Sequence, residues 1–409
     1  MRAPELLSPA GNFEKMRAAI LYGADAVYLA GRLFGMRAAA DNFSTEELRD
    51  AVAYAHERGV KVYLTVNTMP RENEYPELEK YFTHLRDIRP DALIVADLGV
   101  LALAREMLPD IDIHISTQAN AVSSAACLAF AALGAKRVVL ARELSLAEIK
   151  EIRRNLPENI ELECFIHGSM CVSYSGRCLL SNHMVARDAN RGACAQPCRW
   201  NYTIRGYEIT EEKRPDCKMP IEEINGETFV MASRDTCTIE HIPELIEAGI
   251  SSFKIEGRMK SAYYTAVVTN AYRMAIDSYL SGNYSYDPRW YRELLSVSHR
   301  DYATGYYFSD SHTDANISEV AGYLREKAYL ATVLSYNADT GVARLSQRNK
   351  FSRGDACELL TPGSVGRAFT AQELFDESGV PIESVPHPYM EFSMKMPFEV
   401  KCGDIVRAG

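Results

Sequence analysis

The 409-residue sequence lacks long apolar segments. No stretch approaches the roughly 18 consecutive apolar residues of a membrane-spanning helix, and residues 1–9 lack the apolar core of a secretory signal peptide. We therefore expect a soluble, cytoplasmic protein. Positive charge is also in deficit, because the formal net charge is −10. This charge argues against a surface that binds nucleic acid indiscriminately through its phosphates, although recognition by a local patch stays open.

Two protease signatures are also missing: the sequence has no His-Glu-x-x-His and no Gly-x-Ser-x-Gly. A metal-activated water and an activated serine of these common types are therefore not indicated. The chain has no internal repeat of fixed period and no low-complexity tract. Its length exceeds what one hydrophobic core usually supports, so we expect a large domain followed by a smaller one.

Cysteine is concentrated in one segment. Four of the ten cysteines follow the pattern Cys-x6-Cys and then Cys-x3-Cys: Cys171, Cys178, Cys194 and Cys198. In a reducing compartment such a group favours a metal or redox site over a disulfide framework. Structural zinc sites normally use two short Cys-x2-4-Cys pairs, so the first spacing favours a loop that holds a four-iron, four-sulfur cluster. Zinc, disulfides and buried thiols are the alternatives.

Three of the other cysteines are predicted to be structural. Cys127, Cys357 and Cys402 occupy apolar or strand-like surroundings, which favours small core residues. Cys217 and Cys237 lie outside the quartet, and each is either a reserve cluster ligand or an ordinary buried thiol.

Short apolar runs alternate with helical patterns in the first part of the chain. Seven runs have the length and flanks of buried strands: 5–8, 26–30, 62–67, 92–96, 111–116, 137–140 and 162–166. Amphipathic helices are predicted between them, for example over 12–22, 45–58 and 119–133, and these end at Gly23, Gly59 and Gly134. With an eighth run at 252–256, after an insertion that contains the cysteines, the pattern predicts a parallel TIM-type (β/α) barrel. The run 229–233 is a ninth strand candidate, which either lies outside the barrel or indicates a miscount.

The sequence changes character near Gly322. Helices are expected over 262–280 and 288–296, and beyond residue 328 short alternating segments between turn residues predict a small all-β, barrel-like domain. We assign residues 1–300 to the barrel domain, with the cysteine loop at about 168–200. Residues 301–324 are then a linker, and residues 325–409 form the β domain.

Polar residues lie at or just past the ends of several predicted strands. The carboxyl ends of the strands form the catalytic face of TIM barrels, so we expect a site where these side chains converge. Each one alone is more often structural, for example as a helix cap. The set consists of Ser8, Tyr28, Asn67, Asp97, His114, Ser116, Gln118, Arg142, Glu143 and His167.

The segment that starts at Glu163 reads Glu-Cys-Phe-Ile-His-Gly-Ser-Met-Cys-Val-Ser-Tyr-Ser-Gly-Arg-Cys-Leu-Leu-Ser. It resembles the signature of the collagenase-like peptidase family, U32. Residues 5–11, 23–28, 116–118, 190–200 and 253–260 agree with the same family, so the resemblance covers residues 1 to about 280. The β tail and the length are most similar to the branch that acts on transfer RNA.

The resemblance implies an oxygen-independent hydroxylase that converts the wobble uridine of tRNA to 5-hydroxyuridine. It also implies prephenate as the hydroxyl donor, and a four-iron, four-sulfur cluster on the cysteine quartet. Ribosomal RNA and a quinone ring are the substrates of sister branches and stay as alternatives. A collagenase-like peptidase is disfavoured, because its motifs are missing and the candidate nucleophilic cysteines are the expected cluster ligands. A non-enzymatic redox sensor is a further hypothesis.

We predict site residues on this basis. His114, Gln118 and His167 are the catalytic candidates. A dicarboxylate such as prephenate needs cationic donors, for which the candidates are Arg177, Arg199, Lys254 and Arg258. Basic residues of the tail are expected to help hold the RNA: Arg344, Arg348, Lys350, Arg353 and Arg367.

Overall fold

A computed structural model describes residues 3–36, 41–170, 233–309, 316 and 323–409, together with four strands between residues 202 and 230. The four predicted cluster cysteines lie outside these residues, as do Arg177 and Arg199. The chain forms two compact units. The first comprises Met1–Phe13, Asp25–Met259 and His299–Leu324, and the second comprises Glu14–Ala24, Lys260–Ser298 and Arg325–Gly409.

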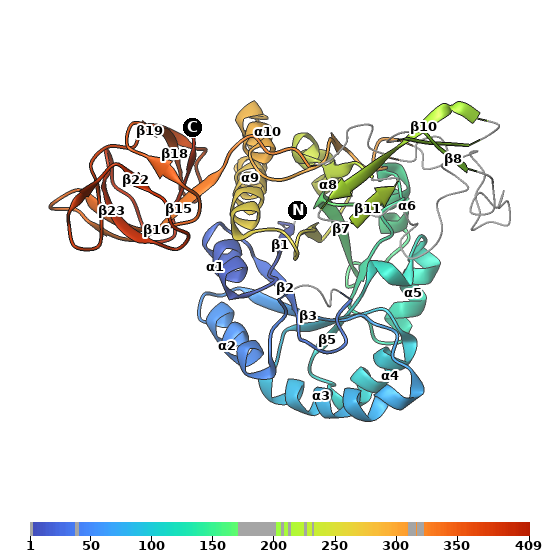
Figure 1. Ribbon diagram of the computed structural model, residues 1–409. Coiled ribbons are helices and arrows are strands. Elements are labelled where there is room, and N and C mark those ends of the chain that lie inside the picture. The colour runs from blue at the N-terminus through green and yellow to red at the C-terminus, as the bar shows by residue number, and fades with distance from the viewer. Residues whose placement is uncertain are drawn as a thin grey trace. The chain divides into compact units, whose positions relative to one another are not determined.

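Eight parallel strands form a closed barrel in the first unit (Figure 1). In chain order they are β1 (Glu5–Pro9), β2 (Ala26–Ala30), β3 (Lys61–Val66), β4 (Ala92–Val95), β5 (Asp112–Ile115), β6 (Arg137–Val139), β7 (Glu161–Gly168) and β13 (Ser252–Ile255). Strands adjacent in this order pair with each other, and β13 pairs with both β7 and β1, which closes the sheet. The predicted TIM-type barrel is therefore confirmed, including its eighth strand.

Helices connect these strands. They are α1 (Phe13–Leu21), α2 (Thr45–His56), α3 (Tyr75–Ile88), α4 (Leu98–Met107), α5 (Ser124–Ala132), α6 (Leu146–Arg154) and α8 (Ile242–Glu247). Capping boxes start two of them, at Ser44 and Ser145, as the Ser-x-x-Glu pattern dictates. The helix predicted from residue 119 begins only at Ser124, because Thr117–Ala119 form a short 3-10 helix that Asn120 ends with a positive φ. No helix in the described ranges is long and apolar enough to cross a membrane.

The barrel interior contains a buried network of charged side chains. The guanidinium of Arg137 lies 2.6 Å from carboxylate oxygens of both Glu5 and Glu161, and 3.2 Å from one of Glu163. The ammonium of Lys254 lies 2.7 Å from the other oxygen of Glu163. Burial alone would raise the pKa of Glu5, but the charge and hydrogen bonds of Arg137 outweigh it and lower that pKa. Such pairing is needed, because an unpaired buried charge is strongly destabilising.

Further strands extend the sheet at the end of β7. The strand β12 (Asp235–Cys237) runs antiparallel to β7, with Cys237 opposite His167, and β14 (Tyr302–Ala303) runs parallel to β12. Four strands of the insertion form a separate antiparallel sheet, in the order β11-β10-β9-β8. They are β8 (Tyr202–Arg205), β9 (Glu208–Glu211), β10 (Arg214–Ile224) and β11 (Glu227–Val230). The ninth strand candidate overlaps β11, which lies outside the barrel.

The second unit combines helices with an all-β tail. Its helices are most of α1, α9 (Ala262–Leu280) and α10 (Pro288–Leu295). The tail contains an eight-stranded antiparallel sheet in the order β19-β18-β24-β15-β16-β23-β20-β21, so the predicted all-β domain is confirmed. These strands are β15 (Tyr329–Asn337), β16 (Val342–Gln347), β18 (Ala356–Leu360), β19 (Arg367–Thr370), β20 (Leu374–Phe375), β21 (Pro381–Ile382), β23 (Glu391–Lys395) and β24 (Ile405–Ala408).

A buried arginine holds this second unit together. Arg407, in β24, makes two ion contacts with the carboxylate of Glu293 in α10, at 2.6 and 2.8 Å, and one with Glu358 in β18 at 2.8 Å. The hydroxyl of Tyr22, next to α1, donates to the carbonyl oxygen of Leu360. The tail is thus tied to helices that precede it in the sequence.

Two of the three cysteines predicted to be core residues are buried, Cys127 and Cys357. The prediction for Cys402 is wrong, because its side chain is exposed. Cys402 lies in the turn before β24, next to Gly403, which has a φ of +92°. A turn residue has no neighbouring strand to cover it, so apolar neighbours in the sequence do not bury it.

Candidate functional site

Polar side chains meet at the carboxyl ends of β3 and β5. The amide nitrogen of Asn67 donates to the side-chain oxygen of Gln118 over 2.5 Å, and the hydroxyl of Ser116 donates to the same oxygen over 3.3 Å. The amide nitrogen of Gln118 contacts the sulfur of Met36. These contacts fix the orientation of Gln118. Because an amide does not titrate, Gln118 is able to bind or orient a reactant but not to act as a general base.

His167 lies at the end of β7 and is buried. Its Nε2 is 3.4 Å from the hydroxyl oxygen of Tyr302, and the two ring centroids are 5.2 Å apart. The ring of Tyr302 in turn stacks on His299, with centroids 4.3 Å apart and planes inclined by 11°. The strands β12 and β14 therefore place a phenol against the imidazole that the sequence singles out.

Gly168, which follows His167, has a φ of +105°. A Cβ at this position would lie 2.3 Å from the carbonyl oxygen of Glu256, just after β13. A side chain is therefore excluded twice, by backbone conformation and by space. The glycine lets the ends of β7 and β13 approach closely beside His167.

The next two residues lead into the cysteine segment, and both are anchored. The carbonyl oxygen of Ser169 accepts from the guanidinium of Arg142 at 3.1 Å, and that of Met170 accepts from the hydroxyl of Ser233 at 2.6 Å. The chain thus enters the cysteine segment at the carboxyl end of the barrel, the face on which barrel enzymes carry their chemistry.

Arg258 also lies at this end of the barrel. It follows β13, its side chain is buried, and its guanidinium is 3.5 Å from the hydroxyl oxygen of Thr65 near the end of β3. We call Asn67, Ser116, Gln118, His167 and Arg258 the carboxyl-end site. A buried guanidinium at this end of the barrel is suited to hold an anionic reactant.

Two predicted site residues lie deeper in the barrel. Lys254 belongs to the interior network through Glu163, and its ammonium also lies 4.7 Å from the ring centroid of Tyr28. His114 is the third residue of β5, where its ring meets the ring of Tyr63 edge-on at 4.6 Å. It lines a pocket at the amino-terminal end of the strands. The structure thus separates His114 from His167 and Gln118, and the catalytic role of His114 stays a prediction, as does substrate binding by Lys254.

Other polar residues at strand ends have structural partners. The carboxylate of Asp97 caps α4 by accepting from two backbone N–H groups, and the hydroxyl of Tyr28 donates to the carbonyl oxygen of Ile255. Sequence reasoning missed Tyr302 as a partner of His167. No signal points to it, because β14 has two residues and lies within the predicted linker.

Metal ligands are not identified among the described residues, in which no three His, Cys, Asp or Glu side chains form a group suited to a metal ion. The predicted quartet and both predicted cationic neighbours, Arg177 and Arg199, are outside those residues. Cys237 is buried and pairs through its backbone with His167. This position is compatible with Cys237 as a reserve cluster ligand and with Cys237 as an ordinary buried thiol.

Comparison with known proteins gives matches along the whole chain. A model of peptidase family U32 matches residues 11–317, and a model of the U32 C-terminal domain matches residues 325–407. The chain is 38% identical to tRNA hydroxylation protein P1 of Bacillus subtilis, over 100% of this chain and 95% of that protein. It is 36% identical to tRNA hydroxylation protein P of Haemophilus influenzae, over 88% of this chain and 86% of that protein. It is also 33% identical to a collagenase of Porphyromonas gingivalis, over 88% of this chain and 86% of that protein.

Proposed function

This chain belongs to peptidase family U32, and from that premise we propose that it hydroxylates the wobble uridine of tRNA to 5-hydroxyuridine. The observation that carries the proposal is the similarity to proteins named for tRNA hydroxylation, which extends over barrel and tail alike. We further propose prephenate as the hydroxyl donor and a four-iron, four-sulfur cluster as the cofactor.

The donor set fits such a cluster. Cys171, Cys178, Cys194 and Cys198 offer four soft thiolates, the ligands that iron–sulfur clusters use. The segment that carries them starts directly after the anchored Met170, at the carboxyl end of β7. When bound there, the cluster would supply electron transfer or shape the site. Four cysteine ligands leave no open iron, which favours these roles over direct binding of the donor.

The residues of the carboxyl-end site have separate tasks in this proposal. Arg258 pairs with a carboxylate of the donor, because a guanidinium offers paired N–H groups to it. Gln118, held by Asn67 and Ser116, donates to a polar atom of the base. Hydroxylation forms a C–O bond on the ring carbon and breaks the C–O bond of the donor's hydroxyl group. The base is thereby oxidised by two electrons, the donor takes up the same two electrons, and the ring carbon releases a proton. The imidazole of His167, which contacts Tyr302, accepts that proton and returns it to the reduced donor.

A peptidase is the alternative, and the similarity to a protein named collagenase supports it. A cysteine peptidase needs an activated thiolate beside a base. Cys164, on the same strand as His167, is buried, and burial raises the pKa of its thiol, so it is not such a nucleophile. Cys164 therefore does not supply the nucleophile that a cysteine peptidase needs.

The experiment that tests the proposal compares tRNA from a strain that lacks this protein with tRNA from a complemented strain, grown without oxygen. We expect nucleoside digests of the deletion strain to contain unmodified uridine where the complemented strain has 5-hydroxyuridine or its derivatives. Unchanged tRNA in the deletion strain would refute the proposal, as would peptide cleavage by the pure protein that disappears in Cys171→Ala.

The cofactor is tested on anaerobically purified protein. Replacing any one cysteine of the quartet by alanine should remove the iron, the sulfide and the visible absorption together with activity. Cys127→Ala is the matched control, because Cys127 is buried in α5, remote in sequence from the quartet. Stoichiometric zinc without iron after cluster reconstitution would exclude an iron–sulfur cluster.

A further inference from the structure

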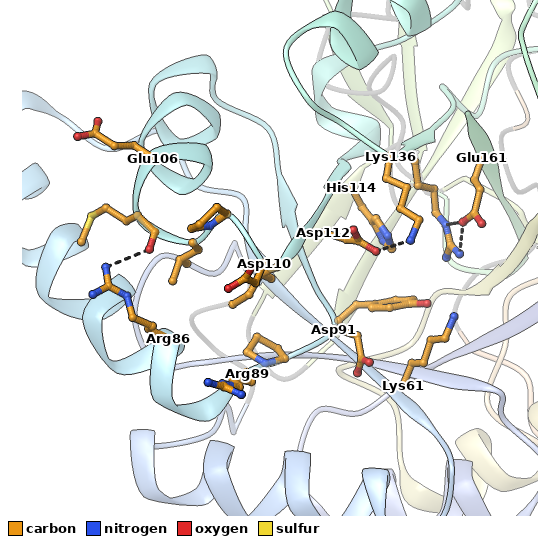
Figure 2. Close-up of a pocket in the computed structure, with 17 residues that line it drawn as sticks. Lys61, Arg86, Arg89, Asp91, Glu106, Asp110, Asp112, His114, Lys136 and Glu161 are labelled. Carbon is orange, nitrogen blue, oxygen red and sulfur yellow. Dashed lines mark hydrogen bonds and ion pairs between the residues drawn. The ribbon is translucent and has the colours of Figure 1, made fainter. Parts of the chain in front are cut away.

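A pocket of about 980 Å³ lies at the amino-terminal end of the barrel strands (Figure 2). Its walls come from the first residues of β3, β5, β6 and β7 and from the loops that follow α3 and α4. Its volume is within the range of small-molecule sites in proteins. It is distinct from the carboxyl-end site, because it opens at the opposite ends of the strands.

His114 forms part of the pocket wall and has an unsatisfied imidazole. The residue is 2% exposed, and its Nδ1 is buried without a hydrogen-bond partner. No hydrogen bond to Nε2 occurs among the described residues either. Burial first, and then the charges of Arg137 and Lys254, hold the pKa of His114 well below its ordinary value. The ring is therefore neutral near pH 7 and carries one N–H that lacks an acceptor.

Two lysines beside His114 retain donors. The ammonium of Lys61 is half exposed, and its nearest carboxylate, that of Glu5, is 3.8 Å away, beyond hydrogen-bond distance. The ammonium of Lys136 is also half exposed and uses one donor on Asp112, at 2.6 Å. Figure 2 shows Lys61, Lys136 and His114 at the same end of the pocket. This end therefore offers N–H groups from three side chains.

The carboxylates at this end are already engaged. Glu161 accepts two hydrogen bonds from Arg137, at 2.6 and 2.9 Å, and Asp91 accepts from the backbone N–H of Val62 and from His56. At the outer rim, Glu106 and Asp110 are offset by Arg86 and Arg89. The inner end of the pocket thus offers more hydrogen-bond donors than acceptors, whereas the acidic and basic side chains of the outer rim are equal in number.

We propose that the amino-terminal pocket binds a small organic anion, a phosphate or a carboxylate compound, whose charged group lies between Lys61 and Lys136 and accepts a hydrogen bond from His114. The remaining volume accommodates the body of the molecule against the mixed rim. The site does not depend on the function proposed for the opposite face of the barrel.

Equilibrium dialysis of the full-length protein with radiolabelled inorganic phosphate or citrate, at low ionic strength, tests the proposal. We expect saturable binding of at least one probe at one site per chain. Lys61→Gln should weaken that binding by about tenfold or more, because one charge-assisted hydrogen bond is lost. Lys80→Gln is the matched control, since Lys80 is exposed on α3 but does not line the pocket.

His114 is tested by a pair of substitutions. His114→Gln keeps an amide N–H near the position of Nε2 and should retain part of the affinity, whereas His114→Phe should lose it. Binding of phosphate alone would indicate phosphate esters, and binding of citrate alone would indicate carboxylates. Absence of saturable binding at millimolar probe, or saturable binding that Lys61→Gln leaves unchanged, would overturn the proposal. Lys61 is half exposed, so its variant tests the site even if His114→Phe fails to fold.

Discussion

The substitution Glu163→Gln tests the charged interior of the barrel. Glu163 is fully buried and is shared between Arg137, at 3.2 Å, and Lys254, at 2.7 Å. Arg137 keeps two other carboxylates after the change, those of Glu5 and Glu161. Lys254 keeps none, since Glu163 is its one carboxylate partner among the described residues. The variant therefore leaves a buried ammonium opposite a neutral amide.

The expected loss of stability follows from that unpaired charge. Removing one partner of a buried ion pair costs about 3–5 kcal/mol of unfolding free energy, which corresponds to a decrease in Tm of roughly 10 °C for a unit of this size. The double variant Glu163→Gln/Lys254→Met removes both charges and should recover about half of the loss, because a balanced apolar replacement of a buried pair is often tolerated.

Urea unfolding followed by circular dichroism measures these differences, and Arg32→Met is the control. Arg32 pairs with Glu47 at 3.9 Å with both side chains more than half exposed, so its loss should cost less than about 1 kcal/mol. If Glu163→Gln costs no more than this control, or if the double variant is less stable than the single one, the buried pair is not what stabilises the barrel.

Three further changes follow from the structure. Tyr302→Phe removes the hydroxyl beside His167 and should lower the rate of the proposed hydroxylation about fivefold without changing the spectrum of the proposed cluster. An unchanged rate would show that the phenol does not orient the imidazole. The pKa of His114 is lowered in the folded protein. As the pH falls below about 6.5, the imidazole of His114 takes up a proton in the unfolded chain but not in the folded one, so the folded protein becomes less stable. The wild type should thus lose about 1.4 kcal/mol per pH unit below that value relative to His114→Phe, which parallel urea titrations at pH 7 and 5.5 would detect. Ending the chain at Leu324 removes Arg407 from the buried carboxylate of Glu293, so the shortened chain should have a lower Tm than the full chain; equal values would exclude a stabilising role for this contact.

The barrel could be predicted from the sequence because its signals are local. Buried strands such as Ala26–Ala30 are short continuous apolar runs, and the helix ends at Gly23, Gly59 and Gly134 all have positive φ. The strand β13, which closes the barrel, is also a short apolar run and could be predicted although a long insertion precedes it. By contrast, β12 and β14 have three and two residues and no pattern that distinguishes them from loops.

The site was only partly predictable because its contacts are not local. His167 and Gln118 lie where strand ends suggest, but the contact of His167 with Tyr302 joins positions 135 residues apart. Lys254 is predicted to bind substrate from its place near a strand end, but its ion pair with Glu163, 91 residues away, is not visible in the sequence. In the tail, the arginines Arg344, Arg348 and Arg353 pair with the carboxylates of Glu391, Glu14 and Glu383. Their contribution to RNA binding stays a prediction. A sequence shows which side chains are charged, but not which side chain each of them pairs with.

The late position of β13 has a consequence for synthesis of the protein on the ribosome. The strand β7 ends at Gly168, and β13 begins only at Ser252. Translation adds about 5–20 residues per second. For several seconds, therefore, β1 and β7 have been synthesised but β13, the strand that pairs with both, has not. During that interval each presents an open edge on which another nascent chain is able to pair. We expect the growing chain to need a holding chaperone over this interval, and the need to end once residues 252–255 have left the exit tunnel.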